Sequence, residues 1–86
     1  MNITLSPQVI FQELDKEAIL LDLNGEAYYG LDEVGMRLWQ LLAENGDFDA
    51  AVAQMLTEYE IDEETLRTEL LELLEDMAQS DLVAWE

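Results

Sequence analysis

The sequence predicts an α+β fold in one domain, residues 1–86, in which a three-stranded antiparallel β-sheet precedes three α-helices. Apolar, β-branched and aromatic runs separated by turn residues fill the first third of the chain, a pattern typical of a β-meander. From residue 32 onward, apolar residues recur at helical spacing. Half of the residues are hydrophobic, which is too many for a disordered acidic chain and enough for one modest core.

The predicted strands are residues 9–14, 18–23 and 26–31. They follow a short extended lead-in that ends at Pro7. Asn24-Gly25 separates the last two strands, and this dipeptide is the strongest short-range hairpin signal because both residues tolerate a positive φ. A two-residue turn there pairs Leu21 with Tyr28 and sets Tyr29 on the opposite face of the sheet. The pattern leaves open which tyrosine packs in the core and which faces a ligand.

Three aspartates mark the expected helix starts, each just before an apolar periodic segment: Asp32, Asp47 and Asp62. Aspartate is a preferred N-cap because its carboxylate accepts a backbone N–H of the first turn. The first helix is expected to end at Asn45-Gly46, and the third to run to about Gln79. The apolar tail, residues 82–85, is expected to fold back on the core.

The charge balance excludes two classes of partner. The chain has 21 acidic residues against three basic ones, Lys16, Arg37 and Arg67, for a net charge of −18. Three scattered cations cannot replace the counterions of a nucleic acid, and the same field repels anionic membrane surfaces. We therefore expect no nucleic acid and no membrane as a partner. A basic partner remains, beside the simpler interpretation that the charge keeps the chain soluble.

The residue types used most often in catalysis are missing. The chain has no histidine and no cysteine, which removes the usual general base, the thiol nucleophile and the common soft metal ligands. Its carboxylates fall at helix caps and polar helix positions, and it contains no calcium loop and no glycine-rich phosphate loop. We expect a protein that is not an enzyme and needs no cofactor or metal. Without a secretion signal or a membrane span, a cytoplasmic location is expected.

The most informative segment is residues 25–42, GEAYYGLDEVGMRLWQLL, which joins a strand directly to a helix. Leu-Asp-Leu precedes it at residues 21–23. In order and spacing these segments resemble the PqqD-like family, the recognition elements for precursors of ribosomally synthesised and post-translationally modified peptides (RiPPs), and especially the stand-alone type as in lasso-peptide biosynthesis. The chain departs from the family at Glu69-Leu70, where Asp-Val is common, and at Asp81-Leu82-Val83, which lacks a glycine.

The resemblance implies a winged-helix-like domain that binds the leader segment of a precursor peptide. The leader adds as a strand beside the third strand and lies against the third helix, so backbone hydrogen bonds supply affinity and side-chain pockets supply selectivity. The other partner would be a RiPP-processing enzyme, namely a leader peptidase, a cyclase or another modifying enzyme. The implied peptide-binding residues are Glu26, Ala27, Tyr28, Tyr29, Gly30, Leu31, Arg67, Leu70, Leu71 and Leu74.

Two alternatives remain open. Arg67 falls inside the apolar arc of the third helix, and its stem can cover the edge of the core while its head pairs with a neighbouring glutamate. The whole chain can instead be a small acidic accessory subunit that stabilises a partner enzyme without binding the leader. A winged-helix shape also occurs in DNA-binding proteins, but the charge contradicts that role.

Overall fold

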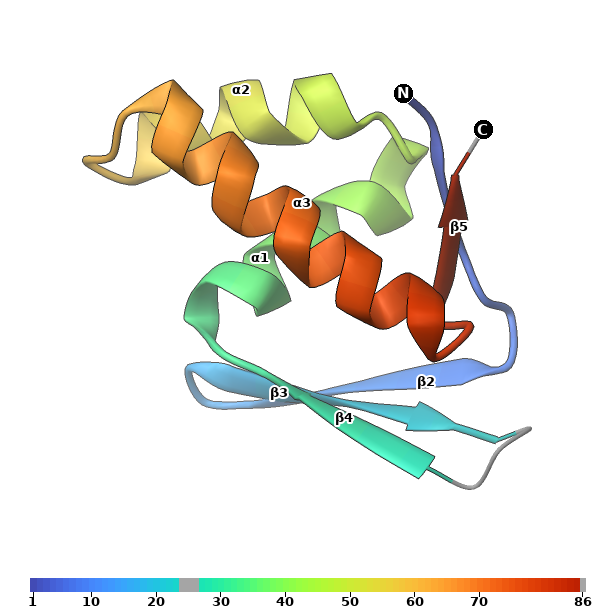
Figure 1. Cartoon of the computed structure of the whole chain (residues 1–86). Helices are drawn as coiled ribbons and strands as arrows, with labels where there is room; N and C mark the ends of the chain where they lie inside the picture. The colour runs from blue at the N-terminus through green and yellow to red at the C-terminus, as the bar shows by residue number, and fades with distance from the viewer. Residues whose placement is uncertain (24–26, 86) are drawn as a thin grey trace.

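The structure, a computed structural model, describes residues 1–23 and 27–85. Its strands are β1 (Ile3–Leu5), β2 (Val9–Leu14), β3 (Glu17–Asp22), β4 (Ala27–Leu31) and β5 (Val83–Trp85), and its helices are α1 (Glu33–Asn45), α2 (Phe48–Glu58) and α3 (Glu63–Gln79). Within the described part of the chain, β2, β3 and β4 form an antiparallel sheet in that order, and the helices follow it (Figure 1). The predicted fold class is confirmed.

The register of the sheet separates the two tyrosines. Leu20 pairs with Tyr29, and Leu21 pairs with Tyr28, as predicted. Leu20 is fully buried, so its face is the core face, and Tyr29 is half-buried against the same core. Tyr28 lies on the outer face and is 76% exposed. The predicted Asn24-Gly25 turn and Glu26 lie outside the described residues.

The helices begin at the predicted aspartates. The carboxylates of Asp32, Asp47 and Asp62 each accept the backbone N–H three residues later, at 2.9, 3.2 and 2.9 Å. This bond satisfies one of the N–H groups that a helix start leaves without an internal partner. At its other end α1 stops at Gly46, which has a φ of 72° and donates its N–H to the Leu42 carbonyl. Glycine adopts this left-handed conformation without steric cost.

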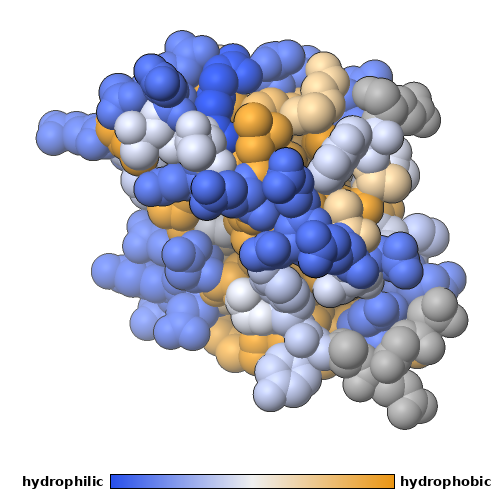
Figure 2. Space-filling model, viewed as in Figure 1, coloured by the Kyte–Doolittle hydropathy of each residue, from blue (hydrophilic) through white to orange (hydrophobic). Residues whose placement is uncertain are grey.

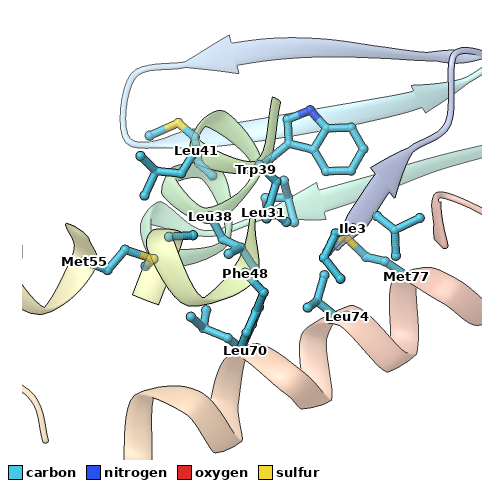
Figure 3. Packing of buried hydrophobic residues seen from close by; sticks show 14 of the residues in the cluster. Ile3, Leu31, Leu38, Trp39, Leu41, Phe48, Met55, Leu70, Leu74 and Met77 are labelled. Carbon is cyan, nitrogen blue, oxygen red and sulfur yellow. The ribbon is translucent and has the colours of Figure 1, made fainter. Parts of the chain in front are cut away.

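The helices cover one face of the sheet and enclose the core against it (Figure 1). α1 packs on β3 and β4, while α2 and α3 both pack on α1. Trp39 is buried and fills the core, as its helical spacing predicted, and Figure 3 shows it with buried side chains of the sheet and the helices. Among the described residues, no helix is both long and apolar enough to cross a bilayer.

A second, two-stranded sheet joins the two ends of the chain, and it was not predicted. β1 pairs antiparallel with β5, with Ile3 opposite Trp85. The lead-in is therefore a strand, and the apolar tail folds back as expected but pairs while doing so. β1 is also fixed to the helices, because the Ile3 N–H donates to the Gly46 carbonyl at 2.7 Å.

Asp81 makes the turn that leads from α3 into β5. Its φ is 59°, and the N–H groups of Asp81 and Leu82 donate to the carbonyls of Ala78 and Met77 at 3.1 and 2.9 Å. This is the Schellman arrangement, whose left-handed position glycine usually occupies. Aspartate tolerates that conformation better than most residues. The chain therefore makes this turn without a glycine at the left-handed position.

Candidate functional site: the groove between β4 and α3

β4 is an edge strand with a helix above its free side. The sheet order β2-β3-β4 gives it one strand neighbour, so its other edge has no strand partner among the described residues. In Figure 1, α3 runs above β4 and slopes in about the same direction. In Figure 2, apolar surface is visible between the polar side chains that follow α3 and the strands beneath them. An edge strand with free N–H and C=O groups is a template for another extended chain.

An open cavity of about 500 Å³ lies where β4 ends and α1 begins. Its lining residues come from β4, the start of α1 and the middle of α3: Gly30, Leu31, Asp32, Val34, Gly35, Glu69, Leu70 and Leu73. Gly35 packs tightly against this lining, because a Cβ at this position would lie 3.1 Å from Leu31 Cδ2 and 3.2 Å from Leu73 Cδ2, and both leucines line the cavity. Leu31, Val34, Leu70 and Leu73 supply the apolar part of the lining, and the two charged lining residues are carboxylates.

Two smaller cavities lie on either side of the first one, toward the start and toward the end of α3. One, of about 240 Å³, shares Val34 and Glu69 with it and reaches toward the start of α3. The other, of about 50 Å³, lies at the end of α3, where Tyr28, Tyr29 and Ser80 line it. We call this series of cavities the β4–α3 groove. Four of the five residues of β4, from Tyr28 to Leu31, line it.

The polar rim of the groove is acidic. Its charged lining residues are Asp22, Asp32, Glu60 and Glu69. Burial raises the pKa of the Tyr29 phenol, and the carboxylate of Asp76 on α3 raises it further. None of Lys16, Arg37 and Arg67 lines these cavities within residues 1–23 and 27–85. The groove therefore combines an apolar floor with negative potential.

The structure brings one part of the expected peptide-binding set together. Residues 27–31 form the free edge, and Leu70 lines the largest cavity beside them. Leu74 is fully buried in the core. Leu71 is 39% exposed and lines none of the three cavities of the groove. Glu26 lies outside the described residues.

Arg67 faces α2 rather than β4. Its guanidinium donates to Asp49 and to Glu63, both at 2.8 Å, and lies 5.9 Å from the centre of the Phe48 ring. The hydrogen bond from Arg67 lowers the pKa of Asp49. Arg67 therefore adopts the alternative arrangement given above: its side chain covers the edge of the core and pairs with a neighbouring glutamate.

Sequence reasoning did not assign several lining residues: Asp32, Val34, Gly35, Glu69 and Leu73. Glu69 and Leu73 are one helical turn apart, on the side of the apolar stripe opposite Arg67. A stripe has two edges, and helical spacing alone does not say which edge faces the sheet. The one signal in the sequence was Gly35, because a glycine inside an amphipathic helix often marks a close approach or a cavity.

Comparisons with known proteins identify a family and a similar solved structure. Residues 17–83 match the model of the family described as coenzyme PQQ synthesis protein D (PqqD). No curated protein matches the chain. Among solved structures, the chain is similar to TbiB1 in complex with the TbiA(β) leader peptide, with a TM-score of 0.88 and 33% sequence identity over 95% of each chain. The family match spans most of the chain, and this protein belongs to the PqqD family.

Proposed function

We propose that this protein binds the leader segment of a ribosomally made precursor peptide as an added strand on β4, and presents it to an enzyme that modifies or cleaves the precursor. The observation that carries the proposal is the free edge of β4 facing the β4–α3 groove. The similarity to a solved complex of TbiB1 with a leader peptide supports it. The absence of histidine and cysteine supports a role in binding rather than in catalysis.

The groove is suited to strand addition in two respects. Each main-chain hydrogen bond of an added strand contributes about 0.5–1.5 kcal/mol net, so the short β4 supplies moderate affinity. The remaining affinity and the selectivity come from side chains that alternate along the added strand, of which every second one points toward α3. The cavity beside Gly35 is large enough to take one such side chain.

Calorimetric titration with the leader of the protein's own precursor tests the proposal, with the TbiA(β) leader as a second probe. We expect saturable binding, with NMR shifts concentrated on residues 27–31 and on the groove side of α3. Ala27→Pro should abolish most of this binding, because proline removes an N–H donor, yet leave the fold intact, because an edge strand tolerates proline. Circular dichroism is the folding control. Shifts confined to α1 and α2, with β4 silent, would contradict this placement.

The alternative role as an accessory subunit is favoured by a different surface. The outer face of the sheet carries exposed apolar side chains in one cross-strand row, Ile10, Leu21 and Tyr28. A partner enzyme can bury such a row without using the groove. Titrations with the leader alone and with the enzyme alone separate the two roles, because an accessory subunit binds only the enzyme.

A further inference from the structure

The charged side chains around the groove all have the same sign. Asp32 caps α1, but Glu60 and Glu69 make no hydrogen bond or ion pair with any residue that the structure describes. After burial, the carboxylate of Asp76 is the second cause that raises the pKa of the Tyr29 phenol, and Tyr29 lines the groove. Glu69 and Asp76 are seven residues apart on α3, which is two turns, so they lie on the same side of the helix roughly 10 Å apart along its axis.

The chain's own arginines do not neutralise these carboxylates. Arg67 is paired with Asp49 and Glu63 on the far side of α3. Arg37 holds Glu58 through two hydrogen bonds of 2.7 Å. Lys16 lines none of the groove cavities among the described residues, so a bound peptide is the component that can supply positive charge to the groove.

We propose that the segment bound in the β4–α3 groove is cationic, with lysine or arginine at groove-facing positions opposite Glu69 and Asp76. This rests on the proposed function and specifies the class of peptide that the site selects. Next-but-one residues of a strand are roughly 7 Å apart, so two long basic side chains two positions apart reach both carboxylates. Neutral or acidic residues there leave the carboxylates partly desolvated without a counter-charge, which opposes binding.

The charge of the whole chain acts in the same direction. A net charge of −18 attracts a cationic segment at long range, which raises its association rate and makes that rate sensitive to salt. The edge of β4 alone does not discriminate between extended peptides, because main-chain hydrogen bonds are common to all of them. The acidic rim thus contributes selectivity that strand pairing lacks.

Selection from a displayed library of random peptides on the intact protein at low salt tests the proposal and requires no precursor sequence. We expect the enriched peptides to carry lysine or arginine at alternating positions. One enriched peptide is then synthesised, together with analogues in which glutamine replaces each basic residue. Binding of the parent peptide should weaken about two- to five-fold with Glu69→Gln and again with Asp76→Asn, the range for solvent-exposed ion pairs.

Glu75→Gln is the matched control, because Glu75 is an exposed glutamate of the same helix that lies six residues from Glu69 and one from Asp76, spacings that place it on a different side of α3 from both. It removes the same charge and should leave binding unchanged. The glutamine analogue of the peptide should lose its sensitivity to Glu69→Gln, because a double-mutant cycle isolates the pair. Equal weakening by Glu75→Gln and Glu69→Gln would overturn local recognition of a basic side chain.

The selection also separates this inference from the function on which it rests. The enriched peptides could show no excess of basic residues and yet fail to bind the Ala27→Pro variant. That result would overturn the inference and leave leader binding on β4 intact. Failure to enrich any peptide, or enrichment that is indifferent to Ala27→Pro, would overturn both.

Discussion

Gly35→Ala should separate binding from folding. Alanine has a helix propensity up to about 1 kcal/mol more favourable than that of glycine, which stabilises α1. Against this gain, the new Cβ would lie 3.1 Å from Leu31 Cδ2 and 3.2 Å from Leu73 Cδ2. Both atoms are the ends of flexible side chains, and moving them off their preferred rotamers costs about 0.5–1.5 kcal/mol. The two effects nearly cancel, so the free energy of unfolding should change by less than about 1 kcal/mol.

The same methyl group should reduce affinity for a leader peptide. It displaces the side chains of Leu31 and Leu73, which line the cavity, and so changes the shape of the cavity that a ligand side chain would enter. A ligand side chain that loses the burial of one methylene loses about 0.8 kcal/mol, which corresponds to an affinity about four-fold weaker. Fluorescence anisotropy with labelled leader measures the affinity, and urea unfolding measures the stability.

Gly30→Ala is the matched control for this experiment. Gly30 is the neighbouring glycine of the groove, but its position in the strand alternates with Tyr29, so a Cβ points to the outer face and meets no atom within 4 Å. We expect unchanged affinity and a stability that is equal or higher by about 0.4–1 kcal/mol, because alanine restricts the unfolded chain. If Gly35→Ala binds leader as tightly as Gly30→Ala does, the cavity beside Gly35 is not part of the binding site.

Three further predictions concern the frame that holds the groove. Gly46→Ala should lower the free energy of unfolding, measured by urea denaturation, by about 2–3 kcal/mol. Residue 46 has a φ of 72°, and a Cβ there would lie 2.6 Å from the Ile3 carbonyl oxygen. A loss below about 1 kcal/mol would show that β1 moves to accommodate the Cβ at little cost. Asp81→Gly should raise the thermal midpoint, since glycine relieves the left-handed backbone at a φ of 59°, and a lower midpoint would contradict that reasoning. The hydrogen bond from Arg37 lowers the pKa of Glu58 from 4.5 to about 2, so the stability that this pair contributes is fully present above pH 4.5 and is lost as the pH falls toward 2. Wild type and Glu58→Gln should differ in unfolding free energy by about 1 kcal/mol at neutral pH, since the pair is exposed. This difference should vanish as the pH falls from 4.5 to about 2. A difference that does not change with pH would refute the lowered pKa of Glu58. Comparing the two proteins also cancels the relief of charge repulsion that protonation brings to the whole chain.

The sequence predicted the helix starts and the β3–β4 register, because both depend on residues that are close together in the chain. Asp32, Asp47 and Asp62 cap the helices as expected, because side-chain capping needs only neighbouring residues. The pairing of Leu21 with Tyr28 followed from a two-residue turn and the alternation of a strand. By contrast, the pairing of β1 with β5 joins residues at opposite ends of the chain. Strands of three residues are too short for a periodic pattern to predict.

The site was predicted in part, for the same reason. The residues alone predicted an available edge strand and the family resemblance predicted its use; the structure leaves that edge open within the described residues. The side of α3 that faces it depends on how α3 packs on α1 and the sheet, which no spacing within α3 reveals. Arg67 and Leu73 lie on opposite edges of one apolar stripe, and only the packed molecule shows that Leu73 lines the groove while Arg67 meets Asp49.

Because β1 and β5 pair, a tether attached at either end of the described chain starts from the same corner of the molecule. In Figure 1 that corner lies away from the lower end of β4. The longest dimension of the molecule is 36 Å, and a flexible glycine-serine linker spans this distance on average with roughly 40 residues. A leader peptide fused through such a linker would meet the groove at millimolar effective concentration. The binding of low-affinity leader peptides could then be compared in such fusions, because a linker at either end of the chain leaves the groove uncovered.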